Sequence, residues 1–205
     1  VMYGGSGFDF VDYSTTANGV VVSLETGSAS GDGSDTFSGI EGIIGSAYGD
    51  KLIGDAGNNV IYDGAGSDVV MAGAGNDVIM AAADGDRDHY KGGAGVDVVD
   101  YSAAHGAISA DLSNGVVRGA AGQDILYDIE GVTGGAGDDT LRGSQKADIL
   151  NGGAGDDFIV GGRGIDALTG GEGSDTFAYA LNDVVSGSNY YGADIITDFG
   201  AGDRR

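Results

Sequence analysis

The stretch from Gly134 to Ala178 decides the fold, because it consists of five consecutive nine-residue blocks: GGAGDDTLR, GSQKADILN, GGAGDDFIV, GGRGIDALT and GGEGSDTFA. Each block follows or approaches the pattern G-G-x-G-x-D-x-U-x, where U is a large apolar residue. A fixed short period of this kind indicates supersecondary units that stack on one another. The pattern therefore predicts an all-β solenoid built from stacked nonapeptide coils.

The same frame extends over most of the chain when the sixth and eighth positions are used as anchors. Further blocks run over residues 4–12, 30–38, 45–53, 54–62, 63–71, 72–80, 92–100 and 119–127. The eighth position is apolar in every block, and the sixth is an aspartate everywhere except Asn59. We therefore expect one apolar side chain and one carboxylate per block in nearly every coil.

The residue types in each block fit a metal site. Glycine at positions one, two and four allows φ > 0, so the chain can turn tightly and aim carbonyl oxygens at one point. The aspartate adds a carboxylate, and calcium takes about six to eight oxygen ligands of both kinds. The three residues after the aspartate alternate as in a strand, which points the eighth side chain into the coil.

Two metal-free alternatives are a solenoid in which Gly and Asp only form turns, and a flexible linker, since 43 of 205 residues are Gly. A linker does not require an apolar residue two places after each aspartate. A metal-free solenoid does not require carboxylates along one edge, where they repel one another. With a net charge of -23, the coil is expected not to form without divalent cations. The same charge argues against binding to nucleic acid and against insertion into anionic membranes.

These blocks resemble the repeats-in-toxin (RTX) family of calcium-binding nonapeptide repeats. The resemblance implies a right-handed parallel β-roll with two blocks per turn, so that Asp139, Asp157 and Asp175 line one edge while Asp148 and Asp166 line the other. It also implies several calcium ions between stacked turns. The metal ligands implied at matching positions are Gly5, Gly7, Asp9, Gly31, Gly33, Asp35, Asp50, Gly64, Gly66, Asp68, Gly73, Gly75, Asp77, Gly93, Gly95, Asp97, Asp124, Gly135, Gly137, Asp139, Asp148, Gly153, Gly155, Asp157, Gly162, Gly164, Asp166, Gly171, Gly173 and Asp175.

Three departures from the family pattern predict weak or absent calcium. Asn59 replaces the aspartate of its block, and Tyr48 and Lys146 each replace the fourth-position glycine. In addition, residues 81–91 break the nine-residue step and contain the run Asp84-Gly85-Asp86-Arg87-Asp88. This run is not an EF-hand, because a histidine stands where that loop needs glycine. An extra calcium at this turn and a solvated acidic loop both remain open, and the second is favoured.

A longer repeat encloses the short one. The segment starting at Gly4 returns at Gly92, which predicts one elongated roll over residues 1–205 with homologous halves at 4–91 and 92–178. Residues 13–29 and 101–118 lie outside the nonapeptide frame and are expected to form wider coils. Residues 179–205 resemble the segment that follows the roll in secreted metalloproteases and polysaccharide epimerases. That resemblance implies a capping segment, here truncated in a fragment of a larger protein, in which Asp194 and Asp198 add ligands.

The sequence and the resemblance together suggest a non-catalytic calcium-binding module. It would fold outside the cell or at the cell surface, as part of a larger adhesin or exoenzyme exported by type I secretion machinery. Catalysis is not expected, because the chain has two histidines and no Cys, H-E-x-x-H or G-x-S-x-G. The alternative is a calcium-dependent module that binds carbohydrate or protein through the apolar outward face of residues 53–80. Its residues are Ile53, Val60, Tyr62, Val69, Met71, Val78 and Met80.

Overall fold

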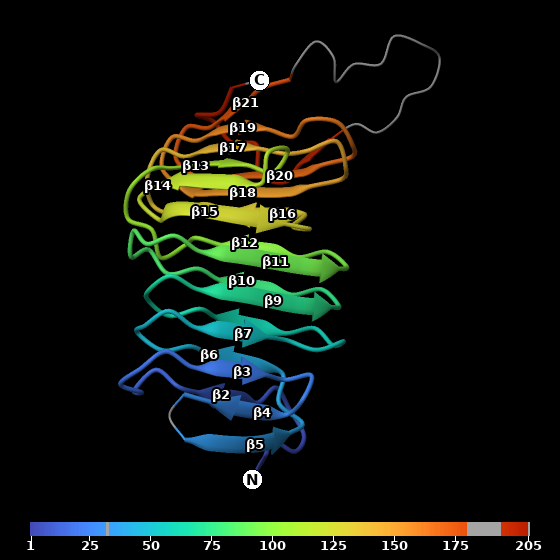
Figure 1. Cartoon of the computed structure of the whole chain (residues 1–205). Helices are drawn as coiled ribbons and strands as arrows, with labels where there is room; N and C mark the ends of the chain where they lie inside the picture. The colour runs from blue at the N-terminus through green and yellow to red at the C-terminus, as the bar shows by residue number, and fades with distance from the viewer. Residues whose placement is uncertain (32, 180–193, 205) are drawn as a thin grey trace.

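The computed structural model describes residues 1–31, 33–179 and 194–204. Within these ranges every regular element is a β-strand. The strands stack as rungs between the N-terminal and the C-terminal ends of the roll (Figure 1). In the part of the chain that the structure describes, no helix has the length and apolar character needed to cross a membrane.

The strands form two sheets. The first has thirteen strands, in the spatial order β1 (Met2–Tyr3), β5 (Ser34–Ser38), β4 (Ser28–Ser30), β3 (Val21–Ser23), β7 (Lys51–Ile53), β9 (Val69–Ala74), β11 (His89–Ala94), β15 (Gly122–Tyr127), β14 (Val116–Gly119), β13 (Ile108–Asp111), β17 (Thr140–Arg142), β19 (Phe158–Val160) and β21 (Thr176–Phe177). The second has nine strands, in the order β2 (Phe10–Asp12), β6 (Gly42–Ile44), β8 (Val60–Tyr62), β10 (Val78–Met80), β12 (Val98–Asp100), β16 (Gly131–Thr133), β18 (Ile149–Ala154), β20 (Ala167–Glu172) and β22 (Ile195–Ile196).

Consecutive blocks alternate between the two sheets, and strands two blocks apart pair in parallel. Leu52 of β7 pairs with Val70 of β9, and Leu150 of β18 pairs with Leu168 of β20. Two blocks therefore complete one turn of the coil, as the resemblance implies. The predicted all-β parallel β-roll is confirmed.

The eighth-position side chains form the core between the sheets. Each of the thirteen predicted residues is buried in one continuous cluster: Val11, Phe37, Leu52, Ile61, Val70, Ile79, Val99, Leu126, Leu141, Leu150, Ile159, Leu168 and Phe177. The core is one apolar residue wide per strand, because the neighbouring positions of a strand face outward.

Two of the predicted nonapeptide blocks are wrong. Residues 30–38 contain the end of β4 and all of β5, and these strands pair in antiparallel fashion. Residues 119–127 likewise join β14 to β15 by an antiparallel turn. The extra length of segments 13–29 and 101–118 is thus accommodated by an inserted antiparallel strand in each half, while the parallel stack continues on either side.

The interpretation favoured from the sequence holds in part, because residues 83–87 are an exposed acidic loop, but Asp88 is buried and residues 81–91 stay within the stack. They form a complete rung that is two residues longer than the others, and its strand β11 pairs with β9, with Tyr90 opposite Val70. Asp88 and Tyr90 are buried, whereas Asp84 and Asp86 are exposed. The step between rungs lengthens here without interrupting the stack.

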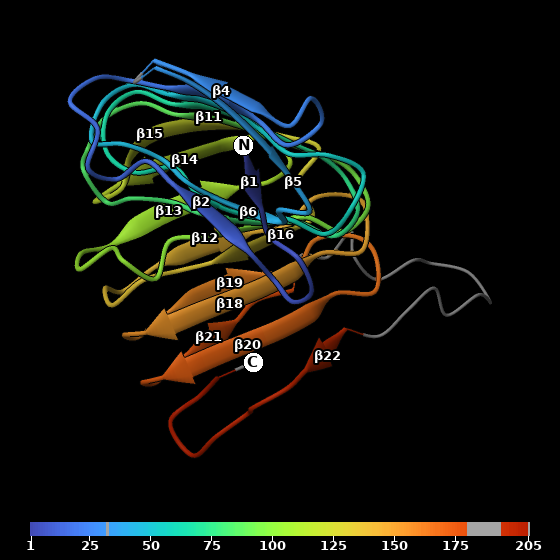
Figure 2. The same ribbon diagram turned by 90° about the horizontal axis from the view of Figure 1, so that it is seen from below.

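Strand order supports the internal duplication. β12 begins at Val98, 88 residues after β2 begins at Phe10, and each inserted antiparallel strand occupies the same place in its half. At the C-terminal end, β22 lies beside β20 (Figure 2) and Arg204 bridges Thr176. The proposed capping segment is described only over residues 194–204, since residues 180–193 lie outside the described ranges.

Candidate metal centre

The sixth-position acids form two hydrogen-bonded ladders along the edges of the roll. In each ladder, one carboxylate oxygen accepts the backbone N–H of the sixth-position residue one rung earlier. Asp157 Oδ1 accepts from Asp139 N at 2.7 Å, and Asp166 Oδ1 accepts from Asp148 N at 2.9 Å. The first edge runs through Asp50, Asp68, Asp88 and Asp124 and, in the second half, through Asp139, Asp157, Asp175 and Asp203. The other edge includes Asn59, Asp77 and Asp97 and, further on, Asp148, Asp166 and Asp194.

The turns before these acids adopt two conformations, which we call open and closed. In an open turn the second- and fourth-position glycines have positive φ, as at Gly153 (103°) and Gly155 (123°). The other open turns carry the glycine pairs Gly5 and Gly7, Gly64 and Gly66, Gly73 and Gly75, Gly93 and Gly95, Gly162 and Gly164, and Gly171 and Gly173. All of these positions except Gly5 and Gly7 also need glycine for space: a Cβ on Gly153, for example, would lie 2.4 Å from the carbonyl oxygen of Gly135.

Most open turns leave a buried carboxylate oxygen without a hydrogen-bond partner. This holds for Oδ2 of Asp9, Asp68, Asp77, Asp97, Asp157 and Asp166. A buried, unsatisfied charged oxygen carries a large desolvation cost. These oxygens are therefore positioned for a cation.

In a closed turn the protein itself satisfies the sixth-position side chain. The second-position N–H donates to it in four turns: Ser46 to Asp50, Asp55 to Asn59, Gly135 to Asp139 and Ser144 to Asp148. Three of these turns carry a residue with a Cβ at the second position, where positive φ is strained. The departures expected to weaken calcium binding, Asn59, Tyr48 and Lys146, all fall in closed turns.

Gly135 and Gly137 were expected to resemble the other ligand glycines, but their turn is closed and neither has positive φ. Its six residues, GGAGDD at 134–139, are identical to those of the open turn at 152–157. The closed turn packs against residues 104–107, where a Cβ on Gly135 would lie 2.3 Å from the carbonyl oxygen of Ala104. The neighbouring rung, and not the local sequence, sets the conformation here.

The first-position glycine has a different role from the one that the sequence suggested. Gly152 and its equivalents do not have positive φ. Instead, a Cβ on Gly152 would lie 2.0 Å from Asp157 Oδ2. In the blocks that have glycine at the first position, the sixth-position side chain of the same block lies where a Cβ would be.

Burial raises the pKa of the ladder carboxyls. It raises the pKa of Asp77 and of Asp166 to about 6, that of Asp157 to about 7 and that of Asp68 to about 8, and carboxylates in adjacent rungs add to the effect. At neutral pH the ionised ladder is therefore costly without a positive partner. Carboxylate and carbonyl oxygens are the hard ligands that calcium prefers. The donor set thus fits calcium.

Comparison with protein families agrees with this geometry. The model of the RTX calcium-binding nonapeptide repeat matches in four copies, over residues 44–79, 133–168 and 157–183. The matched segments are RTX calcium-binding repeats. A search of curated proteins found no match to the chain. RTX repeats form a non-catalytic structural module that binds several calcium ions.

Four acids of the RTX ladders were not predicted as site residues: Glu41, Asp88, Glu130 and Asp203. Glu41 Oε2 accepts from Asp9 N at 3.0 Å, and Glu130 Oε2 accepts from Asp97 N at 3.3 Å. The sequence does contain a signal for three of them, namely a buried apolar or aromatic residue two places after the acid. The pairs are Glu41 with Ile43, Asp88 with Tyr90, and Glu130 with Val132. The acid and the apolar residue mark an RTX rung even where the glycines are missing.

Four implied ligands lie in the two antiparallel turns or beside them and not in RTX turns. Gly31 and Gly33 lie between β4 and β5, and Asp35 Oδ2 accepts from the Tyr13 hydroxyl at 3.2 Å. Asp124 lies in β15 and continues the ladder by accepting from Asp88 N, with Oδ2 buried and unpartnered. Only Asp124 of these four retains the geometry of an RTX aspartate.

The two acids expected to add ligands near the C-terminus lie at the last rungs of the RTX roll. Asp194 Oδ1 accepts from Asp166 N at 3.1 Å. Asp198 accepts from Gly170 N and Gly171 N through its two oxygens, at 2.9 and 2.8 Å. Asp198 therefore serves as an acceptor for the terminal backbone donors.

Proposed function

We propose that this chain is a non-catalytic RTX module that folds when calcium binds, outside the cell, as part of a larger adhesin or exoenzyme exported by type I secretion. The observation that carries the proposal is the set of buried Oδ2 atoms without partners in the open turns. Calcium supplies the positive charge that these oxygens lack. In a calcium-poor cytosol the carboxylates repel one another, and the chain remains unfolded.

The open turns are the proposed calcium sites. In each, the carbonyls of the second- and fourth-position glycines act with the sixth-position aspartate, as at Gly153, Gly155 and Asp157. The closed turns bind calcium more weakly, because the second carboxylate oxygen, which lacks a partner in most open turns, already accepts the second-position N–H. Several coupled sites along one stack give a steep dependence of folding on calcium.

A calcium titration followed by far-UV circular dichroism tests the proposal. Strand content is expected to rise cooperatively with calcium and to disappear on chelation. Magnesium at the same concentrations serves as the control, because it demands near-ideal octahedral geometry and gives up its waters reluctantly. A chain that is fully β-structured in chelator at pH 8 contradicts the proposal.

Binding of carbohydrate or protein remains a second candidate, on a smaller surface than the sequence suggested. The outward apolar positions divide between the two sheets: Ile53, Val69 and Met71 lie on the thirteen-stranded sheet, and Val60, Tyr62, Val78 and Met80 on the nine-stranded sheet. They do not form one face. Tyr62 and Met80 line an open hollow together with Ile44 and Ala103. Glycan-array binding that requires calcium and is lost on Tyr62→Ser is the expected result for this candidate.

A further inference from the structure

At one level of the roll, three departures from the RTX pattern occur together. Asp63 occupies a first position, where most of the other RTX turns have glycine. The rung that packs against it, residues 81–91, has eleven residues. Tyr90 follows the acid of that rung by two residues, as the eighth-position residue of a nonapeptide does, and is fully buried. At the corresponding level of the second half, the chain has Gly152, a nine-residue rung over 170–178 and the buried Phe177.

The three departures fit one another physically. In the second half, a Cβ on Gly152 would lie 2.5 Å from the carbonyl oxygen of Gly170, so a nine-residue rung leaves no room for a side chain. In the first half, the longer rung brings Ala82 N to Asp63 Oδ1 at 2.9 Å. The Tyr90 hydroxyl donates to Asp63 Oδ2. The additional length and the tyrosine thus accommodate the Asp63 carboxylate.

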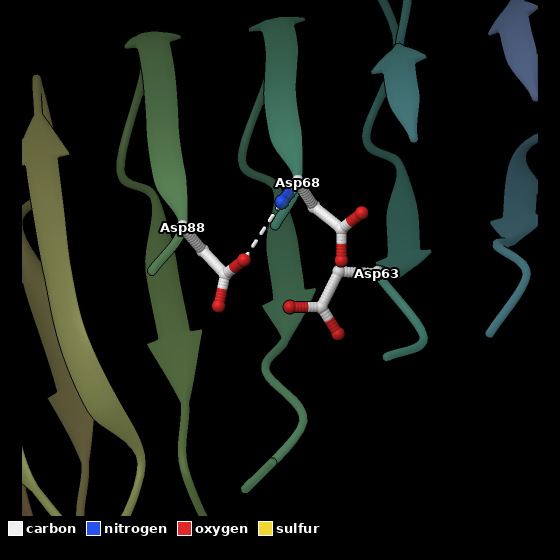
Figure 3. Close-up of side chains that lie close together, drawn as sticks. All are labelled: Asp63, Asp68 and Asp88. Atoms are coloured by element: carbon white, nitrogen blue, oxygen red, sulfur yellow. Dashed lines mark hydrogen bonds between the residues drawn. The ribbon is translucent and has the colours of Figure 1, made fainter. Parts of the chain in front are cut away.

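Asp63 lies beside two ladder aspartates. One carboxylate oxygen from each of Asp63, Asp68 and Asp88 lies within 4.8 Å of the other two. Each residue is only 1% exposed. Figure 3 shows an oxygen of Asp68 directed toward Asp63, and Asp88 on the other side of Asp68. This level therefore holds three carboxylates, whereas the matching level of the second half holds Asp157 and Asp175.

In the described part of the chain, no cationic side chain forms an ion pair with this cluster. Among the described residues, the ion pairs join Lys91 to Asp128 and Lys146 to Glu130, away from the three aspartates. Asp68 Oδ2 is buried and has no hydrogen-bond partner. The donors to Asp63, a backbone N–H and a hydroxyl, are neutral, and each occupies only one of the two lone pairs of its carboxylate oxygen, which leaves the other for a cation. Three buried carboxylates at this separation therefore lack a positive partner.

We propose that Asp63 is an additional calcium ligand, which turns the site between the Asp68 and Asp88 rungs into a three-carboxylate site and makes it the tightest site of the chain. The proposal rests on the proposed calcium function and adds a residue outside the RTX ligand pattern. Calcium affinity rises with the charge of the ligand set. This site is consequently the first to fill as the calcium concentration rises.

The test is a calorimetric calcium titration of the whole chain, with the wild type, Asp63→Asn and Asp63→Gly compared. The asparagine keeps the shape and removes the charge, while the glycine restores the RTX consensus. Both variants are expected to lose the tightest binding event, with its dissociation constant raised by about tenfold or more. Asp12→Asn is the matched control, because it removes one exposed charge outside the ladders and is expected to leave the tightest event unchanged.

Tyr90→Phe separates a metal ligand from a purely structural hydrogen bond. It keeps all three carboxylates, so the tight event is expected to persist. Equal calcium affinities for Asp63→Asn and the wild type overturn the proposal. It is also overturned if neither Asp63→Asn nor Tyr90→Phe folds at any calcium concentration. Folding of Asp63→Asn that is recovered only at higher calcium supports it. A wild type that neither binds calcium nor folds with it refutes the proposed function itself.

Discussion

Acid is expected to substitute in part for calcium in folding this chain. The perturbation is a shift from pH 8 to pH 5 in metal-free buffer. The groups that respond are the buried ladder carboxyls, whose pKa burial raises from the ordinary value of 3.8 to about 6 for Asp77 and Asp166. The pKa values of Asp63, Asp124, Asp157 and Asp68 lie higher still, at about 7 to 8.

The sign follows from linkage. In the unfolded chain these carboxyls are ionised above about pH 4, whereas in the coil they remain protonated up to their raised pKa. The folded state therefore binds more protons between these values, and stability falls as the pH rises through this window. Each of Asp77 and Asp166 favours the coil at pH 5 over pH 8 by about 1.4 kcal/mol. Together they contribute about 3 kcal/mol, which is a large fraction of the stability of a small domain.

The assay is far-UV circular dichroism of calcium-free protein as a function of pH, with light scattering to confirm that the chain stays monomeric. Strand content is expected to increase as the pH falls from 8 to 5. The double variant Asp77→Asn/Asp166→Asn is the control, and its pH dependence is expected to be shallower. In saturating calcium the dependence is expected to reverse, because protonation displaces the metal from its carboxylates. The reasoning is refuted if the protein stays monomeric in metal-free buffer and its strand content falls or does not change on acidification.

Three further predictions test single elements of the roll. Asp157→Asn, in an open turn, is expected to lose calcium and raise the calcium midpoint of folding more than Asp148→Asn in a closed turn, and calorimetric stoichiometry checks this difference. Gly153→Ala combines positive φ with a 2.4 Å clash and is expected to abolish folding, whereas Gly5→Ala meets nothing within 4 Å and is expected to cost only about 1–2 kcal/mol of backbone strain. Asp198→Ala leaves two glycine N–H donors without their acceptor and is expected to lower stability in calcium by about 1–3 kcal/mol for each donor that is left buried, as measured by urea denaturation.

Much of the architecture follows from the sequence, because the nine-residue period fixes which residues face the core and which carboxylates share an edge. The buried row from Val11 to Phe177 and the separate edges of Asp157 and Asp166 were both predictable in this way. Asp88 was not predicted, because the residues before it lack the glycines of the nonapeptide pattern. The acid and the apolar residue two places later were sufficient to identify its rung.

The conformation of individual turns was not predictable from their own residues. Residues 134–139 and 152–157 share the sequence GGAGDD, yet the first turn is closed and the second is open. The difference comes from the rung on the N-terminal side. Antiparallel strands such as β4 and β14 were also missed, because Gly31 and Gly33 serve an antiparallel turn as readily as a metal-binding turn.

The ladders give the roll a direction. Each sixth-position N–H is accepted by the carboxylate of the following rung, so a rung becomes complete only after its C-terminal neighbour is in place. When the rung on the N-terminal side is absent, a sixth-position carboxylate oxygen is exposed and can accept a hydrogen bond from water. When the rung on the C-terminal side is absent, a sixth-position backbone N–H is left without an acceptor at a buried position. Growth of the coil is consequently favoured from the C-terminal end backward, and the last rungs act as a template on which earlier ones are laid down.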